Sequence, residues 1–164
     1  NWQEQTAMQL NSLLKALQQQ ALAQMPEAQW LPRRQQIDEL LDVSDVRCAW
    51  KAISQQSDHS DPLLSRAAKT MSEGSPLTAH LVWEQIARAR HMSLAQVFQM
   101  EYTLSLNCCR HPEFSEGVRA RLIEKDQKPH WHWPDINNVP EAVVDAHFQK
   151  VWEGRHPLAD LSEY

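Results

Sequence analysis

Two histidines stand two residues apart in the stretch Pro129-His130-Trp131-His132-Trp133. Alternate residues of an extended chain face the same way, so the two imidazoles could approach one metal ion. Zinc in proteins takes three or four ligands, however, and the sequence offers no second pair at ligand spacing. We therefore expect no metal site, and interpret the stretch as a proline-anchored aromatic segment that lies on a helical core.

Cys108 and Cys109 are adjacent and could in principle supply a nucleophile. They fall in a helical pattern with apolar neighbours, where a thiol stays protonated and inert, so we expect buried thiols without a catalytic function. With Cys48 they make an odd count of 3, whereas disulfide frameworks use paired cysteines. We expect all three to be reduced, as in a cytoplasmic type of compartment.

A dense run of charges extends from Glu116 to Lys128, and its other cations are Arg119, Arg121 and Lys125. In one interpretation these are solvated side chains on a helix, with Glu at its start and Lys at its end to complement the helix dipole. In the other interpretation the cations meet a phosphorylated ligand. Composition alone favours the first and leaves the second open.

The overall composition excludes several classes of protein. The chain has 164 residues, of which 42% are hydrophobic and 23% charged, with a formal net charge of -5. This length suits one domain, with or without a tail, and the hydrophobic share argues against a disordered chain. No apolar run approaches the ~20 residues that span a bilayer, and the acidic balance disfavours broad binding to nucleic acid or anionic lipid. With only 3 glycines, Gly-rich phosphate loops are not expected.

Apolar residues recur at helical spacing along almost the whole chain. The clearest case is Leu10, Leu13, Leu14 and Leu17, which share one face of a helix predicted over 6–24. Further helices are predicted over 33–41, 46–53, 62–71, 76–91, 94–108, 116–124 and 141–152. No segment of any length alternates with period two, so we predict an all-α fold.

Capping residues mark the ends of several of these helices. Four N-caps are predicted, each a short polar residue before a helical pattern: Asp45, Asp61, Ser75 and Ser93, the last in a capping box with Gln96. Proline at the first helical position supports two of them. Gly74 is predicted to end one helix in the left-handed conformation.

The C-terminal part of the chain has a different character. Residues 125–140 are rich in proline and tryptophan and lack periodicity, so we predict an ordered extended segment. We expect a single helical domain over 1–153 and a tail over 154–164. The chain begins at Asn1 without an initiator Met and enters a helical pattern almost at once, which we interpret as a piece of a longer protein.

Residues 113–131 carry a family resemblance. EFSEGVRA at 113–120 and IEKDQKPHW at 123–131 resemble the C-terminal signature of 3-hydroxyisobutyryl-CoA hydrolases, within the enoyl-CoA hydratase/isomerase (crotonase) superfamily. Two upstream stretches agree in order, GSP at 74–76 and SLAQVFQMEY at 93–102. Three residues depart from the family pattern: Arg121 where an aliphatic residue is usual, Glu124 in place of Asp, and His130 in place of Lys.

The resemblance implies an irregular multi-helix C-terminal domain of a crotonase-like protein. In that family an α/β core carries an oxyanion hole that polarises the thioester carbonyl, and acidic residues that activate water. That core is encoded N-terminal to the residues printed here, so no catalytic residue can be assigned, and we expect the isolated chain to be inactive. The implied activity of the parent protein is hydrolysis of 3-hydroxyisobutyryl-CoA or a similar short branched thioester, in valine catabolism.

The resemblance also implies a site and partners. The C-terminal helices of such proteins cover the acyl-CoA site or pack against a neighbouring subunit, and basic side chains there reach the phosphates of CoA. Arg119, Lys125 and Lys128 are therefore the predicted CoA contacts, with Trp131 as a wall of the site. No cofactor or metal is expected, because CoA is part of the substrate. The expected partners are acyl-CoA, bound through the N-terminal core, and a second copy in a homo-oligomer, but neither nucleic acid nor membrane.

The expected location is the cytoplasm, or the mitochondrion in a eukaryote. Two alternatives for the function stay open. One is the same domain of an enoyl-CoA hydratase or isomerase, since those relatives share the fold and no residue here decides between them. The other is a free-standing helical interaction module with no chemistry of its own.

Overall fold

The computed structural model describes residues 2–163, and within that range every regular element is helical. The elements are α1 (Trp2–Ala21), η1 (Leu22–Gln24), η2 (Leu31–Arg33), α2 (Arg34–Leu41), α3 (Val46–Ser54), α4 (Pro62–Ser72), α5 (Pro76–Ala89), α6 (Leu94–Arg110), α7 (Pro112–Val118), η3 (Arg119–Ile123), η4 (Ile136–Asn138), α8 (Glu141–His147) and η5 (Ala159–Glu163). The η elements are short 3-10 turns, except η3, which is a π-helical turn. The predicted all-α fold is confirmed.

The predicted N-caps are confirmed. The Asp45 and Asp61 carboxylates accept backbone N–H groups of the first turns of α3 and α4, each at 2.9 Å. Ser93 and Gln96 form the predicted capping box, in which each side chain accepts the other residue's N–H. These caps satisfy N–H groups that have no partner inside the helix, so short polar residues define where each helix begins.

The prediction for Gly74 is wrong. Gly154 (φ 75°) is the glycine with positive φ among the described residues, and α4 ends instead with Glu73 in the right-handed region. The Gly74 N–H bonds to the Met71 carbonyl at 2.9 Å. A Cβ at position 74 would lie 3.2 Å from that same oxygen. The close approach of the backbone, not a left-handed conformation, therefore explains the glycine.

The chain divides into two compact units, residues 1–39 and residues 40–164. The first unit contains α1, a long helix of good helix formers such as Ala, Leu and Gln. Its apolar stripe is exposed, with Leu10, Leu13, Leu14 and Leu17 each more than half accessible. None of the side chains that the structure describes in this unit is buried, so the unit has no core of its own.

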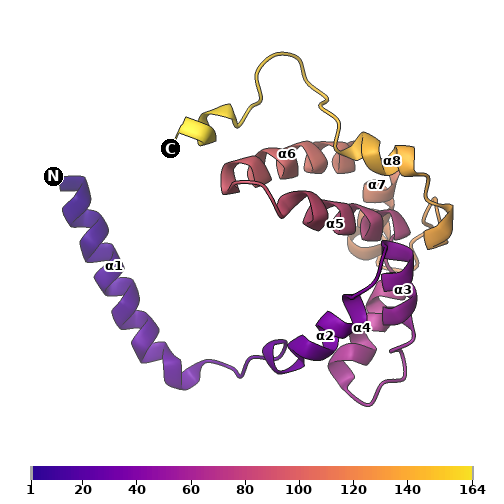
Figure 1. Cartoon of the computed structure of the whole chain (residues 1–164), viewed down its shortest axis with the longest axis horizontal. Coiled ribbons are helices and arrows are strands. Elements are labelled where there is room, and N and C mark those ends of the chain that lie inside the picture. The colour runs from indigo at the N-terminus through magenta and orange to yellow at the C-terminus, as the bar shows by residue number, and fades with distance from the viewer. Residues whose placement is uncertain (1, 164) are drawn as a thin grey trace. The chain divides into compact units, whose positions relative to one another are not determined.

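The second unit has a core between α5, α6 and α8. Leu77 and Leu81 of α5 pack with Leu104 of α6, and Val139 and Val144 complete this cluster. Figure 1 shows α5 and α6 running alongside each other, with α7 and α8 near the end of the pair. On the other side of α5, α3 packs against α4, and η4 contacts both α3 and α5. The extended segment predicted over 125–140 is present, interrupted only by η4.

The C-terminal helix is shorter than predicted. It ends at His147 instead of residue 152, and the Asn107 amide of α6 donates to the carbonyls of His147 and Gln149 beyond the last turn. The predicted tail contacts α6, since the Gln99 amide donates to the Leu158 carbonyl at 3.0 Å. Whether 1–153 behaves as one domain stays a prediction. Among the described helices, none combines the length and the apolarity needed to cross a membrane.

Candidate functional site

The charged run lies on α7, η3 and the loop after them. The helix predicted over 116–124 begins earlier, at Pro112, whose missing N–H suits the first helical position. At Arg119 the helix widens into the π turn, in which the Glu124 N–H bonds to the Arg119 carbonyl at 2.8 Å. Such turns are frequent at functional sites, because they redirect the side chains that follow.

Arg119 organises this turn with all five of its N–H donors. Nε and Nη2 form a fork with the two Glu116 oxygens, at 2.9 and 2.7 Å. Nη1 donates to Asp126 at 2.7 Å and also to Glu124. The second Nη2 hydrogen reaches the Lys128 carbonyl at 3.1 Å. A guanidinium has five N–H donors, so Arg119 has none left for a ligand in this conformation.

The loop that Arg119 holds has a strained backbone. Lys125 and Gln127 adopt left-handed φ values of 57° and 56°. Residues other than glycine rarely adopt such values, because their Cβ atom clashes with the backbone. The Asp126 carboxylate accepts the Lys128 N–H at 2.9 Å, and the Gln127 N–H bonds to the Ala120 carbonyl at 3.1 Å. Residues in this region of φ/ψ space persist only where neighbouring contacts over-determine them, and they cluster at functional sites.

The remaining two predicted cations are available to a ligand. Lys125 and Lys128 are both exposed. Neither forms an ion pair with a residue whose side chain the structure describes. The strained loop therefore presents two free ammonium groups on one short segment.

Trp131 follows the loop and is held on the surface of α7. Its indole Nε1 donates to the Glu73 carbonyl at 3.0 Å. The ring lies over Gly117, where a Cβ would be 3.4 Å from the nearest ring atom. An added Cβ at position 117 would make an ordinary van der Waals contact with the indole, so the ring packs closely on the backbone at Gly117.

Two carboxylates of α7 bind the backbone of the extended segment. Glu116 accepts the His130 N–H at 2.6 Å, and Glu113 accepts the His132 N–H at 2.7 Å. The two N–H groups are two residues apart on an extended segment, so they point to the same side. Glu113 and Glu116 are three residues apart on a helix, so their side chains also share one side. Glu113 is buried and also accepts a hydrogen bond from the Ser75 hydroxyl. Sequence reasoning missed this pairing, although the three-residue spacing of the glutamates was a signal for it.

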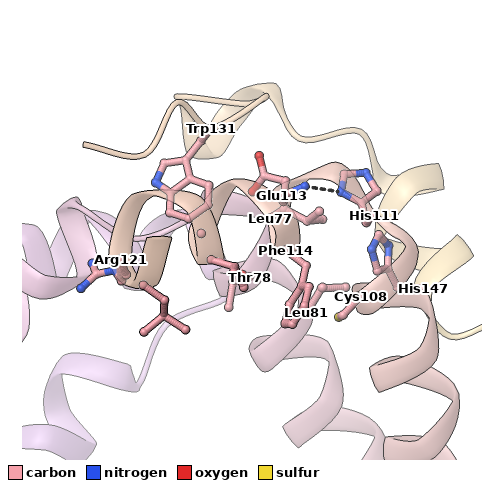
Figure 2. A pocket seen from close by; sticks show the side chains of 13 residues that line it. Leu77, Thr78, Leu81, Cys108, His111, Glu113, Phe114, Arg121, Trp131 and His147 are labelled. Carbon is pink, nitrogen blue, oxygen red and sulfur yellow. Dashed lines mark hydrogen bonds between the residues drawn. The ribbon is translucent and has the colours of Figure 1, made fainter. Parts of the chain in front are cut away.

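A mostly apolar pocket of about 390 Å³ lies beside α7. Its walls include leucines of α5 and the Phe114 ring of α7. Figure 2 shows Trp131 and Arg121 at one end of the pocket and His111 and His147 at the other. Arg121, which departs from the family pattern, thus borders the pocket. Trp131 lines this pocket, and its role as a wall of a CoA site stays a prediction.

The far end of the pocket is a cluster of histidines. His111 Nδ1 accepts the Glu113 N–H at 3.3 Å and so caps α7. Its ring lies 5.1 Å from that of His147 and stacks on Trp133 at 5.5 Å, measured between centroids. Burial lowers the pKa of His111 and the neighbouring His147 lowers it further, whereas Glu113 acts in the opposite direction.

The electrostatics differ around the Arg119 clamp, the set formed by Arg119, Glu116, Glu124 and Asp126. The hydrogen bonds from Arg119, aided by the His130 N–H, lower the pKa of Glu116 to about 2. Arg119 also lowers the pKa of Asp126. In return, the carboxylates of Glu116, Asp126 and Glu124 raise the pKa of Arg119, and Glu116 has the largest effect. Arg119, Glu116 and Asp126 therefore stay ionised at neutral pH.

The groups of this site that could do chemistry are either weakly reactive or already hydrogen-bonded within the protein. Cys108 is half-buried and Cys109 is exposed, so the prediction of buried thiols is wrong for Cys109. Burial and the adjacent Cys109 raise the pKa of Cys108, which makes its thiol a poor nucleophile. The buried Glu113 is already engaged by two donors. Among the described residues, no group of three or more His, Cys, Asp or Glu is placed to hold a metal ion.

A family model described as enoyl-CoA hydratase/isomerase matches residues 1–148. Curated relatives include the mitochondrial 3-hydroxyisobutyryl-CoA hydrolases of Danio rerio, 42% identical over 88 residues, and of Homo sapiens, 37% identical over 83 residues. The aligned regions cover 54% and 51% of this chain but 23% and 22% of those relatives. The part of this chain that aligns thus corresponds to less than a quarter of the length of each of these relatives.

Solved structures with a similar fold carry related names. A carnitinyl-CoA dehydratase from Mycobacterium thermoresistibile is 27% identical with a TM-score of 0.66, covering 77% of this chain and 36% of that protein. An enoyl-CoA hydratase from Rhodobacter sphaeroides is 24% identical with a TM-score of 0.63, covering 87% of this chain and 42% of that protein. The second likeness concerns the fold alone.

Proposed function

The chain belongs to the enoyl-CoA hydratase/isomerase family, and we propose that it is the C-terminal helical part of a hydrolase of 3-hydroxyisobutyryl-CoA or a similar short branched thioester. The role that we assign to it is to cover the acyl-CoA site or a subunit interface. Such a hydrolase would act in valine catabolism. The oxyanion hole and the acid that activates water would lie in a part of the protein outside these 164 residues.

The observation that carries this proposal is the loop over 124–128. The signature shared with 3-hydroxyisobutyryl-CoA hydrolases coincides with a strained, clamped loop that exposes Lys125 and Lys128. A loop held in this way loses little conformational entropy when it binds a ligand. Ammonium groups on such a loop suit the phosphates of CoA. Trp131, which follows the loop in sequence and lines the pocket beside α7, would supply an aromatic wall.

Other features of the parent protein belong to the same proposal. Its substrate contact would be acyl-CoA, without a separate cofactor, and homo-oligomers are expected. The named hydrolase relatives are mitochondrial, which supports a mitochondrial location in a eukaryotic source and a cytoplasmic one otherwise. The isolated chain would not turn over a thioester.

A hydratase or dehydratase of CoA esters is the second candidate. The name of the solved structure that is 27% identical favours it, because that protein is a carnitinyl-CoA dehydratase. The two candidates differ in their product, since only hydrolysis releases the CoA thiol.

The complete protein distinguishes these candidates in one assay. Incubation with 3-hydroxyisobutyryl-CoA should release free thiol, measured with a thiol reagent, whereas crotonyl-CoA should not be hydrated at a comparable rate. Hydration of crotonyl-CoA without thiol release would favour the second candidate. Thiol release by the isolated 164-residue chain would contradict our placement of the active site.

The lysine contacts have their own test. The double variant Lys125→Ala/Lys128→Ala should raise the KM for acyl-CoA about tenfold, as expected for the loss of ~1.4 kcal/mol of binding, with kcat little changed. The matched control is Lys51→Ala/Lys69→Ala, which removes two exposed lysines from α3 and α4. An unchanged KM in the first variant would refute the contact.

A further inference from the structure

Arg119 was predicted as a direct contact of CoA, but its geometry indicates a different role. All five of its N–H donors bond within the protein, to three carboxylates and one carbonyl. Its side chain is only 25% exposed. A phosphate could reach the guanidinium only by displacing one of these acceptors, and the three carboxylates around it would repel an anion.

The acceptors of Arg119 are spread over the whole loop. Glu116 lies on α7 before the loop, Glu124 and Asp126 lie at its start and middle, and the Lys128 carbonyl lies at its end. One planar guanidinium therefore links both ends of the segment to the helix. Lys cannot replace this geometry, because an ammonium is a point charge with three donors.

The loop needs such a clamp, because its backbone is disfavoured without it. Lys125 and Gln127 are the two non-glycine residues with positive φ among those that the structure describes, and they flank Asp126. Free of the clamp, both residues would relax toward negative φ. That relaxation would change the direction in which Lys125 and Lys128 leave the backbone.

We propose that Arg119 is a positioning residue, which holds residues 124–128 in the strained conformation that presents Lys125 and Lys128 to the phosphates of CoA. It does not bind the ligand itself. The identity of the ligand rests on the proposed function, whereas the clamp rests on the hydrogen bonds of Arg119. Arg119 also neutralises carboxylates that would otherwise repel the same phosphates, so the experiment must separate geometry from charge.

A double-mutant cycle in the complete protein tests the proposal. Arg119→Gln and Lys125→Ala/Lys128→Ala should each raise the KM for acyl-CoA about tenfold, with kcat within about twofold of the wild type. Because both changes remove the same interaction, their combination should raise KM little beyond the single changes. If the combined variant raises KM about one hundredfold, the two changes act independently. Arg119 would then contact the ligand itself, and the proposal would be overturned.

Conservative variants separate geometry from charge. Arg119→Lys keeps the positive charge but loses the fork, so it should resemble Arg119→Gln, and added salt should not restore KM. Full rescue by Lys would show that only the charge matters, which contradicts positioning. Asp126→Asn, a smaller change that weakens the clamp, should give a smaller rise in KM and covers the case in which Arg119→Gln fails to fold.

A matched arginine controls for a merely structural effect. Arg88 also pairs with two carboxylates, Glu84 and Asp145, but lies on α5 and does not touch the loop. Arg88→Gln should lower stability without changing KM. If Arg119→Gln leaves KM unchanged while the lysine variant raises it, the proposed function survives and the positioning role fails. If the lysine variant leaves KM unchanged, the proposed CoA contact fails, and the role of Arg119 toward CoA fails with it.

Discussion

The two ends of α7 are held by different chemistry. At its N-terminal end, His111 caps the helix and the buried Glu113 joins it to Ser75 and to the extended segment. At its C-terminal end, Arg119 binds acidic groups that are partly accessible to water. The first end depends on groups taken out of water, and the second on a charged network at the surface.

This difference predicts that one end of α7 contributes mainly to the stability of the fold, and the other mainly to the conformation of the loop over 124–128. Buried hydrogen-bonding groups lose much free energy when a partner is removed, because water cannot replace it. Partly exposed ion pairs contribute less to stability, since water competes for them. We therefore expect changes at the N-terminal end to affect the free energy of unfolding. Changes at the Arg119 end should affect the loop and its ligand more than the fold.

The largest effect on stability is expected at Glu113. Glu113→Ala removes the acceptor of the Ser75 hydroxyl and of the His132 N–H, and the carboxylate is buried. Two donors that lose their partner should lower the free energy of unfolding by about 3 kcal/mol, measured by urea denaturation. Ser115→Ala, an exposed change on the same helix, is the control. If Glu113→Ala lowers the free energy of unfolding no more than Ser115→Ala does, the N-terminal end of α7 does not have the stabilising role assigned to it.

The His111 cap gives a smaller, pH-dependent effect. His111→Ala should lower the free energy of unfolding by about 1 kcal/mol, the usual effect of losing an N-cap. His111→Asn should lose less, because its amide oxygen can accept the Glu113 N–H.

Protonation of His111 should act in the same direction as removal of its cap. Its pKa is lowered in the folded protein, by burial first and then by His147 and His132, so the unfolded chain binds the proton more tightly. The contribution to stability is therefore complete above the unfolded pKa of about 6.5 and is lost as the pH falls below it. The half-buried Cys108, whose pKa is raised, stays uncharged in this range, and Glu113 opposes the shift of His111. Denaturation at pH 8 and pH 5 should show a smaller loss in His111→Asn than in the wild type, and equal losses would exclude this role of His111.

The Arg119 clamp should respond in a different pH range, with the smallest effect on folding. Glu116, with a pKa of about 2, keeps its charge well below pH 4, so the stability that it contributes is present above about pH 4.5 and is lost as the pH falls toward 2. The ¹³C shift of its carboxyl group, followed by NMR, should titrate near pH 2 in the wild type and closer to 4.5 in Arg119→Gln. A midpoint that does not change in the variant would show that Arg119 is not the cause.

The features that sequence could predict are local. Asp45, Asp61, Ser75 and Ser93 cap their helices through bonds to N–H groups two or three residues away, so residue type and spacing are enough. The absence of periodicity likewise predicted the non-helical segment over 125–140. Features that depend on tertiary contacts were missed. The Ser75–Glu113 bond joins residues 38 apart, and the bond from Asn107 to the last residue of α8 joins residues 40 apart.

The role of Arg119 could not be predicted for a related reason. Its charge and its place in the signature suggest a ligand contact, but the number of its donors already in use depends on how the loop returns to the helix. The π turn that begins at Arg119 comes directly before that loop, and no periodicity in the sequence indicates this turn.

Hydrogen–deuterium exchange of the complete protein, measured with and without CoA, tests the central claim most directly. If residues 124–131 form part of the CoA site on a loop held by Arg119, backbone exchange in this segment should slow when CoA is added. In Arg119→Gln the segment should exchange faster without CoA and should gain less protection from it. Exchange over 124–131 that is the same with and without CoA in the wild type would contradict the account.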